Sequence, residues 1–160
     1  MRALLLFAIT LLAGCGFHLR ESAALPAAMT DLRIEVADPF SPIGLEIGRA
    51  LRRAGATLHE SPTDQVAVLR VHVDLMGTSP LSVSGTARVQ EYRVSHHVEF
   101  EVLAADGTVL IARNTIERRR DYRFDETQAL GAAAEDELAR KELRRDTLAA
   151  ILRRIEALGP

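Results

Sequence analysis

Apolar and polar residues alternate along four stretches of the chain, residues 32–37, 66–75, 88–103 and 108–122. Such alternation predicts β-strands with one face on a core and the other in water or against a partner. The third stretch is the clearest. Its even-numbered residues from Tyr92 to Val102 are apolar except for His96. Its odd-numbered residues from Glu91 to Glu101 are polar or charged. Asp106-Gly107 predicts a hairpin turn after it, and residues 76–86, rich in Ser, Gly and Pro, predict a loop before it.

Two further stretches have the period of amphipathic helices. The first opens at Ser41-Pro42, an N-cap followed by a first-turn proline, and closes at Gly55 as a C-cap. The second covers residues 125–158, and some 30 helical residues at 1.5 Å each would extend roughly 45 Å. Its predicted apolar stripe consists of Leu130, Ala134, Leu138, Leu143, Thr147, Leu148, Ile151, Leu152 and Ile155.

The order strand, helix, three strands, helix predicts an α+β fold. We expect a two-layer sandwich in which a mixed four-stranded β-sheet packs against two α-helices, all within one domain of residues 31–160. A helical crossover joins the first two strands, so they should be parallel and connected in the right-handed sense. The later strands follow one another closely and should be antiparallel. Residues 57–59 are expected to add only a brief extended piece.

An apolar run precedes the single cysteine of the chain. The run covers residues 3–12 and follows Arg2. Its last residue begins the motif Leu12-Ala13-Gly14-Cys15. A basic start, a short apolar core and small residues are the layout of a secretory signal peptide. The run is too short to cross a bilayer, which takes roughly 20 apolar residues.

Small residues followed directly by cysteine resemble the lipobox of bacterial lipoproteins. The resemblance implies cleavage before Cys15, with residues 1–14 as the signal peptide and residues 15–30 as a lipidated tether. Three acyl chains would anchor the protein stably, since two lipid signals already suffice. Gly16, where retained lipoproteins have Asp, implies sorting to the outer membrane. The alternative is a plain signal peptide that leaves Cys15 as a free thiol in an oxidising compartment, which would be unusual.

Composition changes this picture little. Removing residues 1–14 leaves 146 residues, enough for one domain with its own core, and shifts the formal charge from −2 to −3. No overall positive field would attract nucleic acid. Of the 20 basic residues only Lys141 is a lysine. A GC-rich genome accounts for that bias more simply than a need for guanidinium groups that bind phosphate or carboxylate.

Candidate chemistry is sparse. His96 and His97 are neighbours on a strand and point to opposite faces, so they cannot share a metal, and no cofactor motif is present. Glu99 and Glu101 are about 6.6 Å apart along the strand, a spacing that paired-carboxylate hydrolases also use. Nothing apolar surrounds them to raise a pKa, so a solvated face explains them better. We therefore expect a protein that is not an enzyme.

Basic residues form the more suggestive pattern. Arg88 and Arg93 flank the start of the third strand, and Arg118 and Arg120 lie two apart near the end of the fourth. Alternate residues share a face, so Arg118 and Arg120 could bind a phosphate together. The other interpretation is a charged strand end that resists edge-to-edge aggregation.

Several short motifs, taken in order, resemble the LptE family of lipopolysaccharide-assembly lipoproteins. They are Cys15-Gly16-Phe17-His18-Leu19-Arg20, Glu91-Tyr92, Tyr122-Arg123-Phe124-Asp125, Gln128-Ala129-Leu130 and Arg144-Arg145-Asp146. The order of predicted elements also agrees with that family over the whole mature chain.

The resemblance implies a lipid-anchored subunit on the periplasmic leaflet of the outer membrane. Such proteins plug the LptD β-barrel, assist its assembly and take part in lipopolysaccharide transport to the cell surface. Candidate lipopolysaccharide contacts, chosen by charge and position, are Arg88, Arg93, Arg118 and Arg120. Two alternatives remain at this stage. One is another outer-membrane lipoprotein adaptor, such as a secretin pilot or a barrel-assembly accessory, and the other is a hydrolase that uses Glu99 and Glu101.

Overall fold

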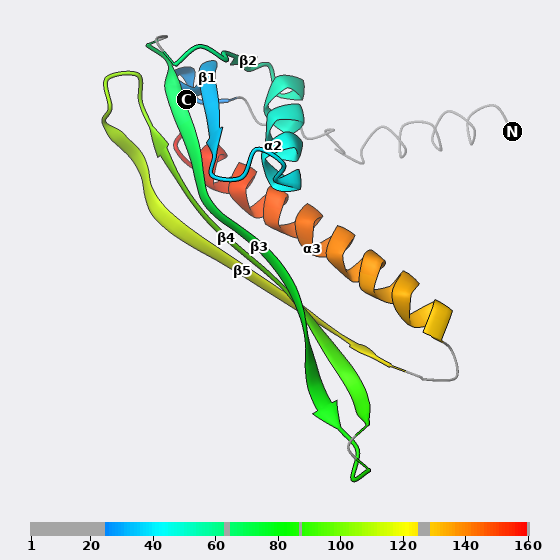
Figure 1. Cartoon of the computed structure of the whole chain (residues 1–160). Coiled ribbons are helices and arrows are strands. Elements are labelled where there is room, and N and C mark those ends of the chain that lie inside the picture. The colour runs from blue at the N-terminus through cyan, green and yellow to red at the C-terminus, as the bar shows by residue number, and fades with distance from the viewer. Residues whose placement is uncertain (1–24, 63–64, 87, 125–128, 160) are drawn as a thin grey trace, which may run out of the picture.

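One mixed sheet, with both long helices on the same face, organises the molecule (Figure 1). The computed structural model describes residues 25–62, 65–86, 88–124 and 129–159. In chain order the elements are η1 (Ala27–Met29), β1 (Asp31–Val36), α2 (Pro42–Arg53), β2 (Thr57–Leu58), β3 (Ala67–Val83), β4 (Val89–Leu103), β5 (Val109–Arg123) and α3 (Ala129–Glu156). Cys15 and the predicted signal peptide lie outside the described residues.

The sheet order is β2-β1-β3-β4-β5, with β1 parallel to both of its neighbours and the other pairs antiparallel. The predicted α+β class, the parallel pairing across α2 and the hairpin at Gly107 are confirmed. The sheet has five strands rather than four because Thr57 and Leu58 pair with Asp31 and Leu32.

Helix α2 begins and ends where its capping residues require. The Ser41 hydroxyl accepts a hydrogen bond from the Gly44 amide at 3.3 Å. At the other end, Gly55 has a φ of 99°, which lets the amides of Ala56 and Gly55 reach the carbonyls of Leu51 and Arg52. This left-handed turn satisfies the last carbonyls of the helix and returns the chain to the sheet.

The alternating strand pattern fills the core as predicted. On β4, Val94, Val98, Phe100 and Val102 are fully buried, and His96 among them is 1% exposed. The apolar side chains form two clusters. The larger one includes Phe100 and the end of α3 around Ile151, whereas the smaller one joins Val94 to Ala139 and Leu143.

The predicted loop over residues 76–86 is wrong for most of its length, because β3 continues to Val83. Its backbone pairs with β4 through small residues such as Gly77 and Ser79, with irregular register only around Pro80 and Ser82. Pairing with a long neighbouring strand outweighs the weak strand propensity of these residues.

The predicted stripe on the last helix is also partly wrong. Leu138 is 54% exposed and Ala134 is exposed, whereas Ala139 and Leu143 face the sheet. The buried face of α3 in fact repeats every four residues, through Ala139, Leu143, Thr147, Ile151 and Ile155. Neighbouring residues on a helix are about 100° apart, so Leu138, one position before Ala139, lies off this face.

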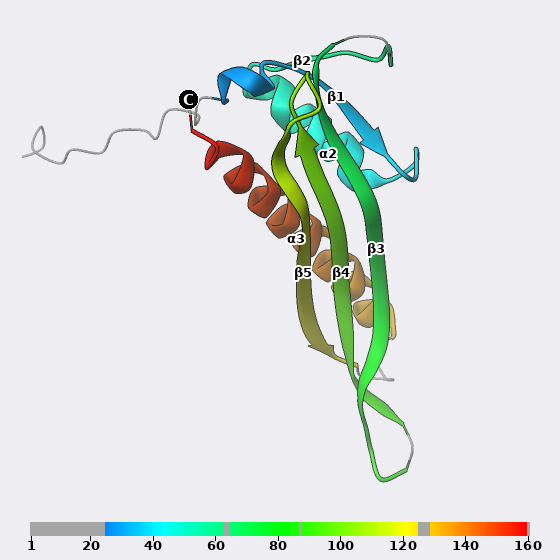
Figure 2. The ribbon, with the colours of Figure 1, turned by 90° about the vertical axis from the view of Figure 1, so that its left-hand side faces the viewer.

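The sheet is much longer than it is wide (Figure 2). The β3–β4 hairpin projects beyond the start of α3, whereas η1 and the end of α3 lie together at the opposite end (Figures 1 and 2). None of the described helices combines the length and the apolar character that a membrane span requires.

Gly44 should not tolerate a side chain. A Cβ atom there would lie 2.6 Å from Cγ1 of Val36, at the contact between α2 and β1. We expect Gly44→Ala to lower the free energy of unfolding by about 1–3 kcal/mol, as overpacking does, although alanine favours helix. Gly48→Ala in the same helix is the control, because its Cβ would meet only the flexible ends of Leu58 at 3.3 Å and Ile34 at 3.4 Å. Urea unfolding measures both, and equal stabilities would contradict the steric account.

Candidate interaction surfaces

The sheet face away from the helices carries charged side chains that pair with one another. Arg70 on β3 bridges two carboxylates, with nitrogen–oxygen distances of 2.8 Å to Glu35 on β1 and 2.8 Å to Glu101 on β4. Hydrogen bonds from Arg70 and Arg33 lower the pKa of Glu35. Three strands are thus joined by one continuous series of ion pairs.

The same face continues across β4 and β5. Glu99 accepts hydrogen bonds from Arg113 on β5 and lies 3.1 Å from the His97 ring, and Arg93 makes two bonds of 2.8 and 2.9 Å to Asp121. Most of these groups are partly exposed, so each pair contributes little stability. What they create is a broad polar surface of nearly balanced charge.

The two carboxylates considered for hydrolysis belong to this paired surface. Hydrogen bonds from His97 and Arg113 lower the pKa of Glu99, whereas a general acid at neutral pH needs a raised one. Glu101 is already engaged by Arg70 and lies 3.2 Å from the His72 ring. The environment of both groups is that of a structural ion pair.

A buried polar network lies between the two apolar clusters. His96 contacts Asp74 at 2.8 Å through Nε2 and Thr147 at 2.9 Å through Nδ1, while Asp74 also accepts a 2.6 Å bond from Ser41. The order Asp, His, Thr has the appearance of a nucleophile triad. Thr147 is fully buried and His96 is 1% exposed, so this hydroxyl cannot reach a substrate.

This network could not be found from the sequence. The prediction that His96 and His97 point to opposite faces is confirmed, since His96 is buried and His97 contacts Glu99 on the polar face. The available signal was His96 itself, a histidine at an otherwise apolar strand position, which requires a hydrogen-bonding partner. Its two partners are 22 and 51 residues away in sequence. Such partners cannot be identified before the fold is known.

The four arginines selected from the sequence do not form one cluster. Arg118 and Arg120 pair in register with His96 and Val94, which places them on the helix-covered face beside α3. Both are exposed, and Arg120 forms an ion pair with Glu142 of α3. Arg93 lies on the opposite face, paired with Asp121, and Arg88 lies at the exposed tip of the β3–β4 hairpin. Only Arg118 and Arg120 could bind the same small group.

Aromatic contacts join β4 to the end of β5, and polar contacts join β3 to the start of α3. The Tyr92 ring stacks on Tyr122 at 5.7 Å and meets Phe124 edge-on at 5.4 Å. Asp136 on α3 accepts hydrogen bonds from Thr78 on β3 and from Arg140. Together these contacts stabilise the part of the sheet nearest the β3–β4 hairpin and its packing against α3.

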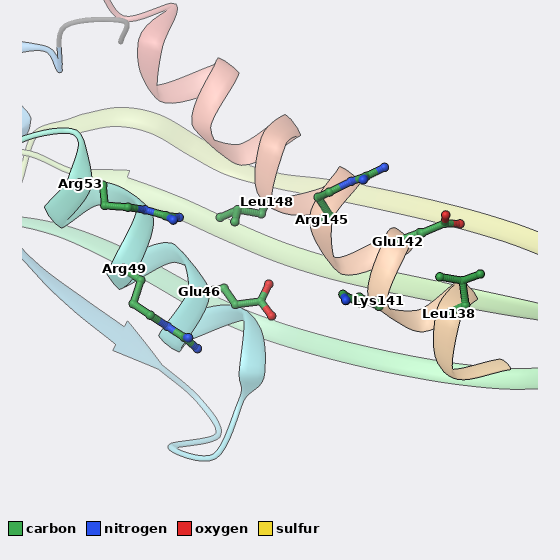
Figure 3. A pocket seen from close by; sticks show the side chains of 8 residues that line it. All are labelled: Glu46, Arg49, Arg53, Leu138, Lys141, Glu142, Arg145 and Leu148. Atoms are coloured by element: carbon green, nitrogen blue, oxygen red, sulfur yellow. The ribbon is translucent and has the colours of Figure 1, made fainter. Parts of the chain in front are cut away.

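A groove separates α2 from α3 on the helical side (Figure 3). It encloses about 480 Å³, and Arg53 and Leu148 point toward one another across it (Figure 3). Its lining residues are Glu46, Arg49, Arg53, Leu138, Lys141, Glu142, Arg145 and Leu148. The two acidic ones are paired with arginines outside the groove, Glu46 with Arg144 and Glu142 with Arg120. The groove therefore has a basic character.

Polar faces, a projecting hairpin and a shallow basic groove around a closed core define a binding or assembly domain. The model of the LptE lipopolysaccharide-assembly family matches residues 29–155, and the chain belongs to this family.

Individual comparisons agree with that assignment. The chain is 28% identical over 152 residues to the LPS-assembly lipoprotein LptE of Photorhabdus laumondii, covering 95% of this chain and 82% of the relative. The LptE of Yersinia enterocolitica is also 28% identical, with 95% and 73% covered. Among solved structures, lipoprotein B from Nitrosomonas europaea superposes with a TM-score of 0.76 at 26% identity, covering 89% of this chain and 91% of that one. The rare lipoprotein B from Shewanella oneidensis gives 0.67 at 29% identity, with 79% and 94% covered.

The buried network should make stability depend on pH. Burial opposes charge on Asp74, but hydrogen bonds from His96 and Ser41 outweigh it and lower the pKa of this carboxyl. Because folding lowers this pKa, the ionised carboxylate stabilises the fold at pH values above its unfolded-state pKa of about 3.9. This stabilisation is lost as the pH falls through the folded-state pKa. We expect Asp74→Asn to cost about 1–3 kcal/mol at neutral pH. The cost should shrink on acidification below about pH 4.

Urea unfolding of both proteins between about pH 7 and pH 3 measures this difference. A stability difference that stays constant over this range would show that the ionised carboxylate of Asp74 does not stabilise the fold.

Proposed function

We propose that this protein is an outer-membrane lipoprotein that plugs an LptD-type β-barrel and assists lipopolysaccharide assembly and transport to the cell surface. Lipid attached to Cys15 anchors it on the periplasmic leaflet, and it acts by binding rather than by catalysis. Besides family membership, the observation that carries the proposal is the polar, self-paired outer face of the sheet.

A plug inside a barrel meets walls that are lined with polar residues. A sheet face of balanced, mutually paired charge suits such surroundings, because it offers hydrogen-bonding groups while exposing no large apolar patch. The helices bury the opposite apolar face, so the domain can fold before it meets a barrel. A lipid tether would keep it close to the barrel and raise its effective concentration there.

Lipopolysaccharide carries phosphate groups, and arginine binds phosphate through two parallel hydrogen bonds. The candidates remain Arg88, Arg93, Arg118 and Arg120. Arg118 and Arg120 are the favoured pair, since they share a face of β5 and are about 6.6 Å apart along it. Arg120 would first have to release Glu142, and Arg93 would have to release both of its bonds to Asp121.

The first test is co-purification of the tagged full-length protein from detergent-extracted outer membranes. We expect a large β-barrel protein in equimolar amount, identified by mass spectrometry. A secretin or a different assembly complex in its place would instead support the alternative, an adaptor lipoprotein that does not bind lipopolysaccharide.

Replacing both favoured arginines by glutamine should weaken lipopolysaccharide binding. Each lost charged hydrogen bond costs roughly 1–3 kcal/mol, so Arg118→Gln with Arg120→Gln should raise the Kd at least about tenfold. Arg119→Gln is the matched control, because this arginine lies between them and points to the opposite face. Isothermal titration with lipopolysaccharide measures all three proteins. Equal losses for the pair and the control would remove the assignment to these two side chains.

The anchor has its own test. Cys15→Ala should give an uncleaved precursor without lipid, seen as a larger intact mass and as loss of metabolic labelling with a fatty acid. Gly16→Asp is the companion variant, which should still be lipidated but remain in the inner membrane. If Cys15→Ala were processed and labelled as the wild type is, Cys15 would not be the attachment site.

A further inference from the structure

One edge of the long sheet lacks a neighbouring strand over much of its length. β1 pairs with β3 only as far as Val71, and the amide of Ala37 donates the last backbone bond on that side, 3.0 Å from the Val71 carbonyl. β3 then continues for another twelve residues to Val83, paired with β4 alone among the described strands. Figure 2 shows this free edge along β3 below the end of β1.

This edge lacks the charges that usually prevent strand addition. Natural edge strands are protected by charged side chains, proline or bulges, because unpaired backbone groups otherwise recruit another chain. Between Leu75 and Thr86 the sequence has no charged residue and a single proline, Pro80. Leu75 is 64% exposed and Val83 is 61% exposed. The edge is therefore uncharged and partly apolar from Leu75 onward, and its protection is limited to Pro80 and the irregular register between Pro80 and Val83.

The opposite edge of the same sheet is protected in the usual way. β5 carries five consecutive charged residues from Glu117 to Asp121, with further arginines at Arg113 and Arg123. Both edges belong to one molecule in one environment, so a general need for solubility does not explain the difference. It indicates that the β3 edge is kept free to be paired.

A recess marks where an added strand would begin. At the point where β1 leaves the sheet, a hollow of about 400 Å³ is lined by residues 71–75 of β3 and by Ala37, Asp38 and Ser41. After His72, Asp74 is the only charged residue of β3. Its two carboxylate oxygens are bonded to Ser41 and His96. Its charge is thus turned inward, and an incoming backbone would not meet it.

We propose that the β3 edge from Val73 to Val83 accepts an extended segment of the partner barrel protein as an additional strand of the sheet. Main-chain hydrogen bonds would provide the affinity, and alternate apolar side chains of the segment would pack beside Leu75 and Val83. The inference rests on the proposed function, because it specifies how the barrel partner is held.

A second copy of this chain fits the edge less well. An antiparallel pair of β3 edges in full register would align Val73 with Val83 of the copy. Residues 84–86 of the copy would then run toward Val71, where β1 is already paired. A single extended segment can end at the recess without meeting β1.

Lysine at the two exposed apolar positions tests the proposal in the full-length protein. Leu75→Lys with Val83→Lys should reduce the recovery of barrel protein in the co-purification about tenfold, because it adds the charges that protect edges. Val109→Lys is the matched control, since Val109 is 56% exposed on the opposite edge strand. Melting temperatures confirm that the variants fold.

Hydrogen exchange of the wild-type complex gives a direct readout of the backbone. The amides of residues 73–83 that point away from β4 should become at least about tenfold more protected when the barrel is bound, whereas those of β5 should change less. Normal barrel recovery by the lysine variant, or unchanged exchange at these amides, would overturn strand addition and leave the plug proposal standing. A variant that loses only self-association would assign the edge to a second copy and also overturn it. Failure of the wild type to recover a barrel would remove both proposals.

Discussion

The position of α3 on the sheet depends on the buried contact between Thr147 and His96. The two apolar clusters on either side of it are made of interchangeable aliphatic contacts, which do not by themselves fix where a long helix lies along a strand. A shift of α3 by one turn would leave Nδ1 of the buried His96 ring without its hydrogen-bond partner, which costs free energy. Asp74 extends the constraint through Ser41 to the first turn of α2. One polar network therefore sets both helices relative to β3 and β4.

The parts of the fold that depend on local pattern could be predicted. Alternation along β4 identified its buried face residue by residue, and Ser41 and Gly55 marked both ends of α2. The failures have physical causes of a different kind. Residues 76–83 have little strand propensity, yet they pair because β4 lies beside them. On α3 the buried position is Ala139, a small side chain that hydropathy alone ranks below the exposed Leu138 beside it.

Candidate surface residues were less predictable for the same reason. Arg93 and Asp121 are 28 residues apart, and nothing in either segment indicates that they neutralise each other. Strand alternation correctly placed Arg118 and Arg120 on one face, although it could not indicate that Glu142 of α3 would lie beside Arg120. Charge on a sequence thus identifies which groups can bind an anion. Only the fold shows which of them already have partners.

The extension of β3 to seventeen residues also determines how far the molecule reaches. At about 3.3 Å per residue, the strand spans roughly 55 Å. Element η1 and the end of α3 lie near one end of this length, and the hairpin tip lies at the other (Figure 1). If the proposed lipid anchor holds the chain ahead of η1, a small tilt at that end displaces the hairpin tip in proportion to this length. Contacts along the sheet would then determine where the tip is placed.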